Sequence, residues 1–443
     1  MQLLTATGPS LDSREILNKF RKDNPATKFL RFQWQDYSGV LRGRVVPMDT
    51  VLAQISKGGP LKATGLALCV SLTNNLIPST PLDGQFWMLP DWSTLHPTAT
   101  PGSAQVMCAL DFTVPATGPV SREVCPRHVL NKVLQQAHED WGLKFLVGFE
   151  VEFVVMKANP STGKTERCSQ GWGLFSIAGL RDPCYQYVEQ CVSQLEALGV
   201  DIQAIHTEGQ RGQYELALGP RPPLEAVDQL VLVHSYLKDT FARHGYVVTM
   251  VPKPVASESL ANGQHTHLSL QPTRPDLEES FLAGILKRLP SLCSLCLPQD
   301  VSYERLLPFV AGGNTACWGT ETRFAPIRKI ESCRWEIRNI DAMANMYSTL
   351  AAIIGAGLCG LAGREPLLWP DLGDPANKDA PRGEPLPKNL EEAIALLDGD
   401  AFGLAVVLGR PIIDRYVEMK RFELSKLEVM DPESARELFI ELF

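Results

Sequence analysis

The alternation of apolar and polar residues predicts a small β-rich unit at the start of the chain. Ile16, Leu17 and Phe20 lie on one face of a predicted helix over residues 11–24. A turn at 36–39 then joins two alternating runs, which is typical of a β-hairpin. The predicted strands of this unit, which spans residues 25–112, are 28–34, 40–47, 65–72, 85–89 and 104–112.

From about residue 120 onward, helices and strands are mixed over more than 300 residues. Pro126 opens a predicted helix that runs through about residue 141, since proline is favoured at the first helical position. Residues 364–389 are rich in Pro, Gly and Asp and are expected to form a long surface loop. The other predicted strands are 145–156, 206–218, 246–251, 263–270 and 334–339, and the other predicted helices are 183–198, 223–244, 278–289, 343–362, 390–398 and 409–440.

Composition and charge narrow the possible functions. The 443 residues are 44% hydrophobic and 21% charged, which excludes a largely disordered chain. A net charge of −8 argues against nucleic acid or an anionic membrane as the main partner. The apolar stretch from about 346 to 363 is expected to be a buried core helix, because a membrane span needs a longer and more strongly apolar run.

The cysteines and the first residues predict a cytoplasmic protein. Eleven cysteines are scattered along the chain, and only Cys293 and Cys296 form a CxxC pair, with no second pair to complete a zinc site. The N-terminal segment has neither a basic region nor an apolar core of the kind found in signal peptides. We therefore expect reduced thiols in a cytoplasmic compartment.

The candidate chemistry lies in four stretches that place ionisable residues two apart in apolar runs, or on either side of a turn. Residues i and i+2 of a strand share one face of its sheet. Charged groups on a sheet face in apolar surroundings are costly unless they are paired or bind a metal. The four stretches contain Glu150 and Glu152; Glu208 and Glu215; His265 and His267; and Arg334, Glu336 and Arg338.

Each stretch alone has an ordinary explanation. Glu150 and Glu152 would more often mark a solvated sheet face. His265 and His267 are as often satisfied sheet histidines as metal ligands. Together, however, five glutamates and two histidines on one sheet predict a site for divalent cations, and oxygen-rich ligation favours Mg²⁺ or Mn²⁺ over structural zinc. Nearby arginines suit phosphate or carboxylate groups.

An ordered series of motifs resembles the glutamine synthetase superfamily. Each motif is modest alone, but their order along the chain is specific, and the resemblance runs from about residue 28 to the C-terminus. The matching segments are 34–44 (WQDYSGVLRGR), 89–94 (LPDWST), 148–153 (GFEVEF), 206–208 (HTE), 212–215 (GQYE), 252–254 (PKP), 262–270 (NGQHTHLSL), 302–305 (SYER), 323–328 (RFAPIR), 335–338 (WEIR) and 344–347 (ANMY).

The resemblance implies an α+β fold in two domains. Residues 1–115 would form an N-terminal β-grasp-like domain. Residues 116–443 would form a catalytic ATP- and metal-binding domain, with a curved antiparallel sheet flanked by helices. It further implies a homo-oligomeric ring, in which the N-terminal domain of one subunit closes the active site of its neighbour.

The resemblance also implies the cofactors ATP and Mg²⁺ or Mn²⁺, and a role for each matching residue. One metal would lie beside the substrate carboxylate, and another would bridge the ATP phosphates. The first metal would be held by Glu152, Glu208 and Glu215, and the second by Glu150, His265 and Glu336. Arg323 would act on the transferred phosphate, Arg328, Arg334, His267 and Ser269 would lie by the nucleotide, and Arg305 and Arg338 would bind the carboxylates of glutamate.

The sequence departs from the family pattern where ammonium would bind. The flap position of a family glutamate is Ala311, and the loop 61–68, which would supply an aspartate, has no acid. Without gaps, the family's Asn-Gly pair for the glutamate amino group falls on Leu260 and Ala261. An ammonium pocket needs carboxylates to bind the ion and remove its proton. We therefore expect an amine larger than ammonium.

The resulting interpretation is an ATP-dependent carboxylate–amine ligase that forms a γ-glutamyl amide, or a related acyl amide, through an acyl phosphate. Its small-molecule partners would be an acid, with glutamate as the default, and an amine. Two alternatives remain open: a true glutamine synthetase that uses ammonium, and a non-catalytic relative with a structural or regulatory role. Retention of six ligand positions disfavours the non-catalytic alternative, because buried carboxylates without a metal are costly.

Overall fold

The structure is a computed structural model. It describes residues 11–59, 61–80, 84–113, 121–169, 171–258, 260–306, 312–377, 380, 382–399 and 403–443. The predicted domain boundary at 115/116 and the flap position Ala311 lie outside these residues, so both remain predictions.

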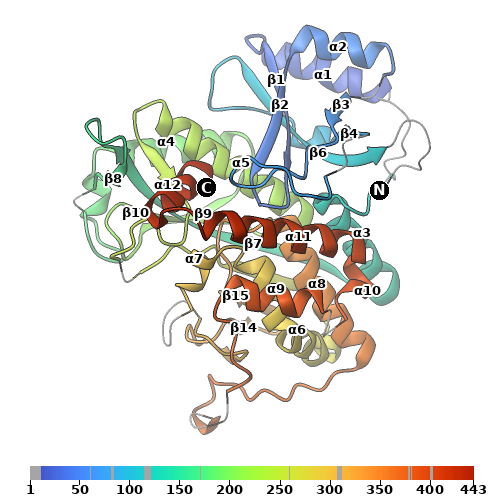
Figure 1. Ribbon diagram of the computed structural model, residues 1–443, viewed down its shortest axis with the longest axis vertical. Coiled ribbons are helices and arrows are strands. Elements are labelled where there is room, and N and C mark those ends of the chain that lie inside the picture. Colours follow the sequence, from blue (N-terminus) through green and yellow to red (C-terminus); the bar gives the residue numbers. More distant parts are fainter. Residues whose placement is uncertain are drawn as a thin grey trace.

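The N-terminal part forms a sheet covered by two helices, at the blue end of the chain in Figure 1. The sheet has the order β2-β1-β6-β4-β3, with β5 on the edge of β6. The predicted hairpin is confirmed, since β1 and β2 are antiparallel and Gln35 lies opposite Leu41. The elements are α1 (Leu11–Asp23), β1 (Phe29–Gln35), β2 (Leu41–Pro47), α2 (Met48–Ser56), β3 (Leu61–Thr64), β4 (Gln85–Pro90), β5 (His96–Pro97) and β6 (Ser103–Thr113).

The prediction of a strand over 65–72 is wrong. The strand is β3, which lies just before that run and pairs with β4. In β3, buried Leu61 and Ala63 alternate with exposed Lys62 and Thr64. The chain then turns, because the amide of Ala67 bonds back to the carbonyl of Thr64.

A second, largely antiparallel sheet carries the candidate chemistry. Its order is β13-β14-β15-β12-β7-β10-β9, with β8 and β11 also paired to β7. The β13–β14 pair is parallel, and the other pairs are antiparallel. Its strands are β7 (Lys144–Ala158), β8 (Thr165–Arg167), β9 (Ile202–Thr207), β10 (Gln213–Leu218), β11 (Val247–Thr249), β12 (Thr266–Gln271), β13 (Trp318–Thr320), β14 (Ile327–Glu331) and β15 (Arg334–Ile337).

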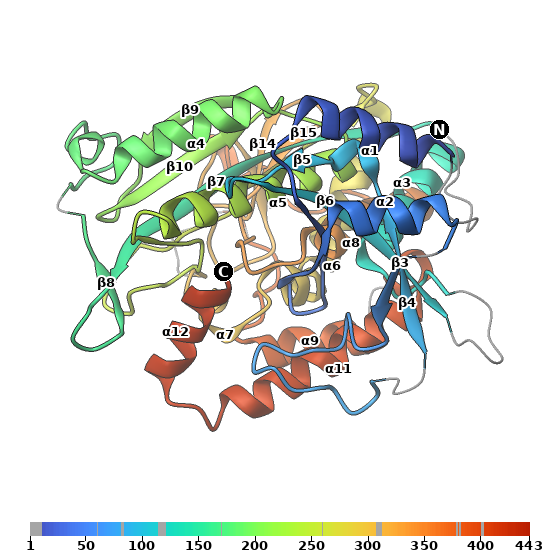
Figure 2. The ribbon, with the colours of Figure 1, turned by 90° about the horizontal axis from the view of Figure 1, so that it is seen from above.

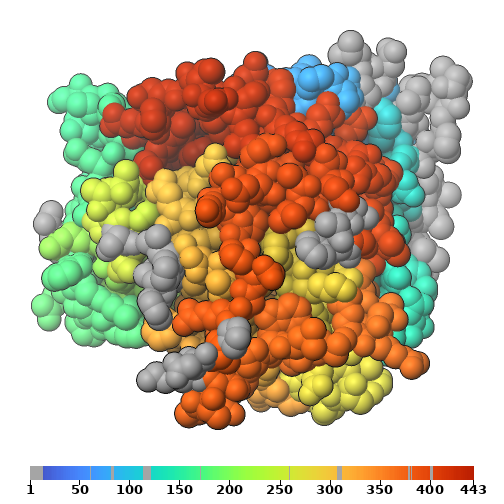
Figure 3. All heavy atoms as spheres, turned by 60° about the horizontal axis from the view of Figure 1, so that its bottom comes forward, coloured from blue at the N-terminus to red at the C-terminus, as the bar shows by residue number. Residues whose placement is uncertain are grey.

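Helices flank this sheet, and α9 and α11 lie side by side along one edge of the molecule (Figures 1 and 2). Orange and red atoms of the C-terminal third dominate the face shown in Figure 3. The helices are α3 (Pro126–Trp141), α4 (Tyr185–Ala197), α5 (Pro223–Ala242), α6 (Pro275–Cys296), α7 (Asp300–Tyr303), α8 (Met346–Gly363), α9 (Leu390–Asp398), α10 (Ala405–Leu408), α11 (Arg410–Leu427) and α12 (Pro432–Leu442).

The apolar helix α8 packs against α3 and α6 in the core, as the sequence predicted. Among the described residues it is the one helix long and apolar enough to cross a membrane, but 83% of that stretch is buried inside the protein. Asn345 caps its start by accepting hydrogen bonds from the amides of Tyr347 and Ser348. These contacts identify α8 as a core helix.

Three predicted elements differ from the structure by more than a few residues at their ends. The strand predicted over 206–218 is a pair, β9 and β10, separated by a turn in which Gly212 has a φ of 72°. Helix α6 extends beyond the predicted 278–289 and includes Pro290. The helix predicted over 409–440 is two, because Asp431 caps a new helix at Pro432.

Candidate functional site

Strand β7 presents two glutamates toward the site through simple alternation. Phe149, Val151 and Phe153 are buried in the hydrophobic core on one face of the strand. Glu150 and Glu152 therefore point to the other face, as the sequence predicts.

The register of the neighbouring strands brings other ionisable residues to the same face. In β10, Glu215 lies opposite Glu152, and in β9, His206 lies opposite Glu215. On the other side of β7, His267 of β12 lies opposite Glu336 of β15. Residues distant in the sequence thus converge on adjacent strands of one sheet.

Glu150 lies between two histidines. Its two carboxylate oxygens are 2.8 Å from Nδ1 of His265 and 3.0 Å from Nε2 of His267. Burial opposes the ionisation of Glu150, but the hydrogen bonds with these histidines outweigh it and hold its pKa below the ordinary range. His267, predicted to lie by the nucleotide, thus contacts a predicted metal ligand.

Glu215 lies in a strongly negative environment. Burial, followed by the negative charges of Glu150, Glu152, Glu208 and Glu336, raises the pKa of Glu215 to about 9. Burial and the charge of Glu152 likewise raise the pKa of Glu208. His206 Nε2 is 3.0 Å from an oxygen of Glu208 and 3.6 Å from one of Glu215. These carboxylates are held together at an electrostatic cost that a bound cation would relieve.

Glu336 joins this cluster to two arginines. Its carboxylate accepts hydrogen bonds from Arg338 and, at 2.9 Å, from Arg328. Burial opposes its ionisation, but positive charge at His265 and Arg338 leaves the pKa of Glu336 below the usual value.

Arg305 lies at the end of the cluster, beside Gly263. It is buried and donates to the carbonyl of Ile340 at 2.7 Å. A Cβ atom at Gly263 would lie 2.7 Å from the Arg305 guanidinium and 3.0 Å from Glu152. Glycine therefore lets the backbone pass between a cation and a carboxylate of the site.

Unsatisfied donors show where an anion would fit. Among the described residues, the buried Nε atoms of Arg305, Arg328 and Arg338 have no hydrogen-bond acceptor. Buried polar groups are usually paired, and arginine is well shaped for carboxylate and phosphate. The arginines beside Glu336 and Gly263 are therefore suited to an anionic ligand.

The other predicted residues lie at the edges of the site or beyond its hydrogen bonds. Ser269 is half-buried on β12, opposite Arg334 of β15. Arg334 donates to Glu331 at 3.1 Å, in an exposed pair. Arg323 is exposed in the connection between β13 and β14. Their roles remain predictions from the resemblance.

The donor set fits divalent metals such as Mg²⁺ or Mn²⁺, because carboxylate oxygens dominate and histidine nitrogens complete it. In each of three groups, one possible ligand atom per residue lies within 4.8 Å of the others. These groups contain five of the six predicted ligands in new combinations, leave out Glu152, and add His206 and His267. The groups are Glu150, His267 and Glu336; Glu150, Glu215 and His265; and His206, Glu208 and Glu215.

Sequence reasoning assigned no role to four residues of this site. Gln213 donates to Glu152 at 3.1 Å and to the side chain of Asn262 at 2.8 Å. Asn262 and Gly263, two residues after the gap-free alignment position, are the Asn-Gly pair that borders the site. His206 is two residues before Glu208, and this i, i+2 spacing could have identified it.

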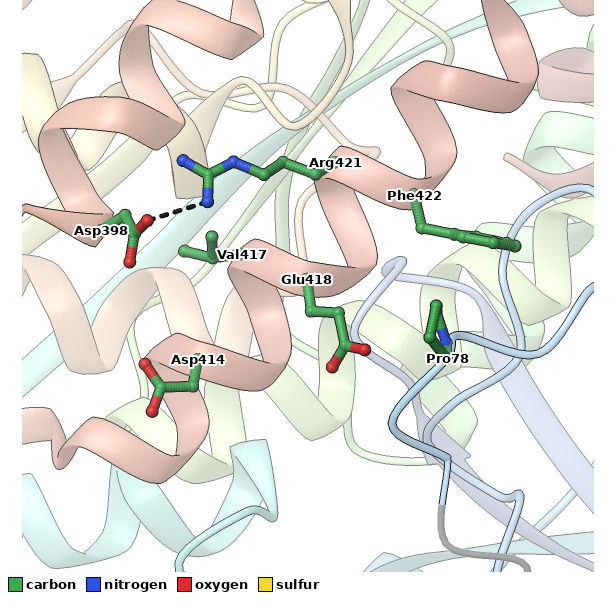
Figure 4. Close-up of a pocket in the computed structure, with 7 residues that line it drawn as sticks. All are labelled: Pro78, Asp398, Asp414, Val417, Glu418, Arg421 and Phe422. Carbon is green, nitrogen blue, oxygen red and sulfur yellow. Dashed lines mark hydrogen bonds and ion pairs between the residues drawn. The ribbon is translucent and has the colours of Figure 1, made fainter.

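A hollow elsewhere on the surface lacks these properties. It has a volume of about 450 Å³ and lies along α11, between Pro78 and Asp398 (Figure 4). Its carboxylates are already paired: Asp398 with Arg421 at 2.8 Å, and Glu418 with the amide of Ser79 at 2.8 Å. It therefore offers little unpaired charge to a ligand.

Comparison with known proteins agrees with this geometry. Residues 123–436 match the family described as "Glutamine synthetase, catalytic domain". The chain is 31% identical to "Protein fluG" of Emericella nidulans over 98% of its own length, and spans about half (51%) of that protein. It is 30% identical to "Gamma-glutamylpolyamine synthetase GlnA3" of Streptomyces coelicolor, over 89% of each chain.

A solved structure has the same fold. The structure titled "GmaS/ADP complex-Conformation 1" superposes with a TM-score of 0.79 at 23% identity, covering 96% of this chain and 99% of the other. This likeness confirms the α+β fold predicted from the sequence. Because the family match covers most of the chain and includes every residue of the carboxylate cluster, the chain belongs to the glutamine synthetase family.

Proposed function

We propose that the protein is an ATP-dependent carboxylate–amine ligase that forms a γ-glutamyl amide. The observation that carries this proposal is the convergence of Glu150, Glu152, Glu208, Glu215 and Glu336 on one sheet face, with buried arginines beside them. Such a site can hold cations and an anionic substrate together. In a protein that bound neither cations nor an anionic substrate, so many carboxylates close together would only be an energetic cost.

The arginines would bind the anionic groups of the substrates, and the carboxylates would bind the cations. Arg305 and Arg338 would hold the acid through its carboxylates, and Arg328 and Arg323 would contact the phosphate groups of ATP. The bound divalent cations would supply charge neutralisation for phosphoryl transfer. The carboxylate cluster would orient these cations relative to the acid.

The proposed reaction has two steps. Transfer of the γ-phosphoryl group to the acid makes an acyl phosphate and ADP, because a free carboxylate is a poor electrophile. The amine nitrogen then bonds to the acyl carbon, the bond to the phosphate oxygen breaks, and phosphate leaves with the electron pair. The amine loses a proton to water, and an amide remains.

Two observations support an amine other than ammonium. The loop 61–68 carries no acid, and position 311 is alanine. The name of the Streptomyces coelicolor relative refers to a γ-glutamylpolyamine synthetase. We also infer a homo-oligomeric ring, by analogy with the family.

The test is ADP release from Mg-ATP and glutamate with a panel of amines beside an ammonium control. We expect release with at least one amine well above ammonium, and loss of turnover in Glu336→Ala. Strong turnover with ammonium at neutral pH would favour a true glutamine synthetase. ADP release from no pair of acid and amine, in a protein that also binds no Mn²⁺, would favour a non-catalytic role.

A further inference from the structure

Large apolar side chains are exposed in the segment 172–177, between β8 and α4. Trp172, Leu174, Phe175 and Ile177 are 67%, 55%, 65% and 60% exposed. Single exposed apolar residues are ordinary, but neighbouring ones form a patch of the kind that binds a ligand or a partner. The position of this patch indicates whether it binds a ligand or a partner protein.

The segment is fastened to the end of β9, next to the carboxylate cluster. The amide of Phe175 donates to the carbonyl of Thr207 at 3.0 Å. The hydroxyl of Thr207 donates to the carbonyls of Gly173 at 3.2 Å and Ser176 at 3.1 Å. Thr207 lies between His206 and Glu208, so the patch is anchored to the backbone that positions two site residues.

Phe175 directly contacts the site. Its ring packs against that of His206 in a tilted arrangement with the centroids 4.7 Å apart, and His206 in turn hydrogen-bonds with Glu208. Phe175 has a φ of 56°, a conformation that is costly for a bulky residue and is often retained at functional sites. The ring thus forms an apolar wall immediately beside a charged cluster.

Leu260 is a second apolar residue near Glu208, because it lies against Gly209, the next residue in the chain. It is 41% exposed, and a Cβ atom at Gly209 would lie 2.2 Å from its Cδ1 atom. Because Gly209 has no side chain, Leu260 can lie over the turn after β9. Two separate apolar segments therefore contact the chain neighbours of Glu208, Phe175 at Thr207 and Leu260 at Gly209.

We propose that Phe175 and Leu260 bind the apolar body of the amine substrate, and that the preferred nucleophile is a primary amine with an aryl group. This inference rests on the proposed function. The carboxylates attract the ammonium end of such an amine, while the aromatic and aliphatic side chains remove its ring from water. A small hydrophilic amine would leave the wall exposed.

The experiment compares two amines in the full chain with Mg-ATP and glutamate. For each, kcat/KM is measured from ADP release, with 2-phenylethylamine as the aryl amine and methylamine as the small one. We expect a preference for 2-phenylethylamine. In Phe175→Ala and in Leu260→Ala, the ratio of the two kcat/KM values should fall about tenfold, as expected for the loss of an apolar contact.

Val429→Ala is the matched control, because Val429 is 84% exposed and lies outside the site; it should leave the ratio unchanged. Equal use of both amines by the unaltered chain, or an unchanged ratio in both variants, overturns the inference and leaves the ligase proposal standing. Absence of ADP release with every amine overturns the ligase proposal itself. If Phe175→Ala dissociates an oligomer in sedimentation without changing the ratio, the patch is a subunit contact and the inference is wrong.

Discussion

Glu152 and Glu215 lie directly opposite each other on β7 and β10, with both side chains buried. Opposed like charges destabilise a sheet unless something between them compensates. Burial and the neighbouring carboxylates raise the pKa of Glu215 to about 9, so near neutral pH the metal-free protein holds this group protonated. Under the proposed function, a metal bound by Glu215 would displace that proton.

The first prediction concerns Glu215→Gln. Glutamine has the shape of protonated Glu215, so the metal-free variant should melt at the same temperature as the unaltered chain, or slightly higher. Mn²⁺ at about 100 times its Kd should stabilise the unaltered chain by about 2.7 kcal/mol. The variant should lose most of that gain, since it lacks an ionisable ligand.

Thermal melts with and without Mn²⁺, after treatment with a chelator, measure this difference. Glu428→Gln is the control, because Glu428 is exposed after α11 and should leave the metal response intact. An equal gain in Glu215→Gln and in the unaltered chain would show that Glu215 is not a ligand.

A second prediction concerns Asn262, which links the site to the segment that follows β11. Its amide donates to the carbonyl of Val251 at 2.8 Å and accepts from Gln213, which holds Glu152 at 3.1 Å. Asn262→Leu should cost about 1–3 kcal/mol, because it leaves buried polar groups unpaired. It should also weaken metal binding, because Gln213 loses the bond that orients it.

Urea unfolding and Mn²⁺ titration of the same protein separate these two effects. Asn18→Leu, at an exposed position of α1, should change neither. A variant that is less stable but binds Mn²⁺ with unchanged affinity would confine Asn262 to a structural role.

Residues whose roles follow from alternation within one strand could be predicted from the sequence. Glu150 and Glu152 on β7 are the clearest case, because apolar neighbours on the opposite face identify their side of the sheet. Short strands such as β13 and β14 could not be predicted, since three to five residues carry little periodicity. Tertiary burial likewise carries α6 through Pro290, where local propensity favours a break.

Contacts between distant segments were beyond sequence reasoning. Gln213 and Asn262 lie far apart in the sequence, and only the tertiary fold brings Asn262 to the start of β10. The ligand groups in the structure differ from the predicted ones for the same reason. His267 lies beside Glu150 because of the register between β12 and β7. A resemblance assigns a role to each matching residue, but it does not give the distances between these residues.

A third prediction concerns the buried ion pair of Lys420 and Glu423 on α11. Both side chains are fully buried and lie 2.9 Å apart. Glu423 also accepts hydrogen bonds from Ser38, from the amide of Leu72 at 3.0 Å and from Gln299 at 3.0 Å. It therefore connects α11 with two N-terminal loops.

Glu423→Leu should destabilise the protein by about 3–5 kcal/mol, because it leaves the ammonium of Lys420 buried without its partner. Lys420→Met should cost less, since Glu423 keeps its other donors. The double variant should be more stable than Glu423→Leu alone, and urea unfolding of all three variants checks this order. Additive losses in the double variant would contradict a direct coupling between the two charges.

The last prediction is a pH dependence that arises from Lys238 on α5. Lys238 lines a hollow of about 710 Å³ between α5, β11 and α12, and burial lowers its pKa from 10.5 to about 7. The folded chain therefore binds the proton of Lys238 more weakly than the unfolded chain does. This difference lowers the ΔG of unfolding, and this penalty has its full size below pH 7. As pH rises from 7 toward 10.5, the unfolded chain still carries the proton while the folded chain does not, so this penalty diminishes.

Lys238→Met removes the penalty, and its stabilising effect should be largest at pH 6–7 and should vanish near pH 10. The expected gain at pH 7 is about 1–3 kcal/mol, since Lys238 as a whole residue is only half-buried. The difference in melting temperature between Lys238→Met and the unaltered chain, followed across this range, isolates Lys238 from other titrating groups. Lys164→Met is the control, because Lys164 lines the same hollow but pairs with Glu433 at the surface. A difference for Lys238→Met that stays constant with pH would mean that Lys238 keeps its ordinary pKa in the folded chain.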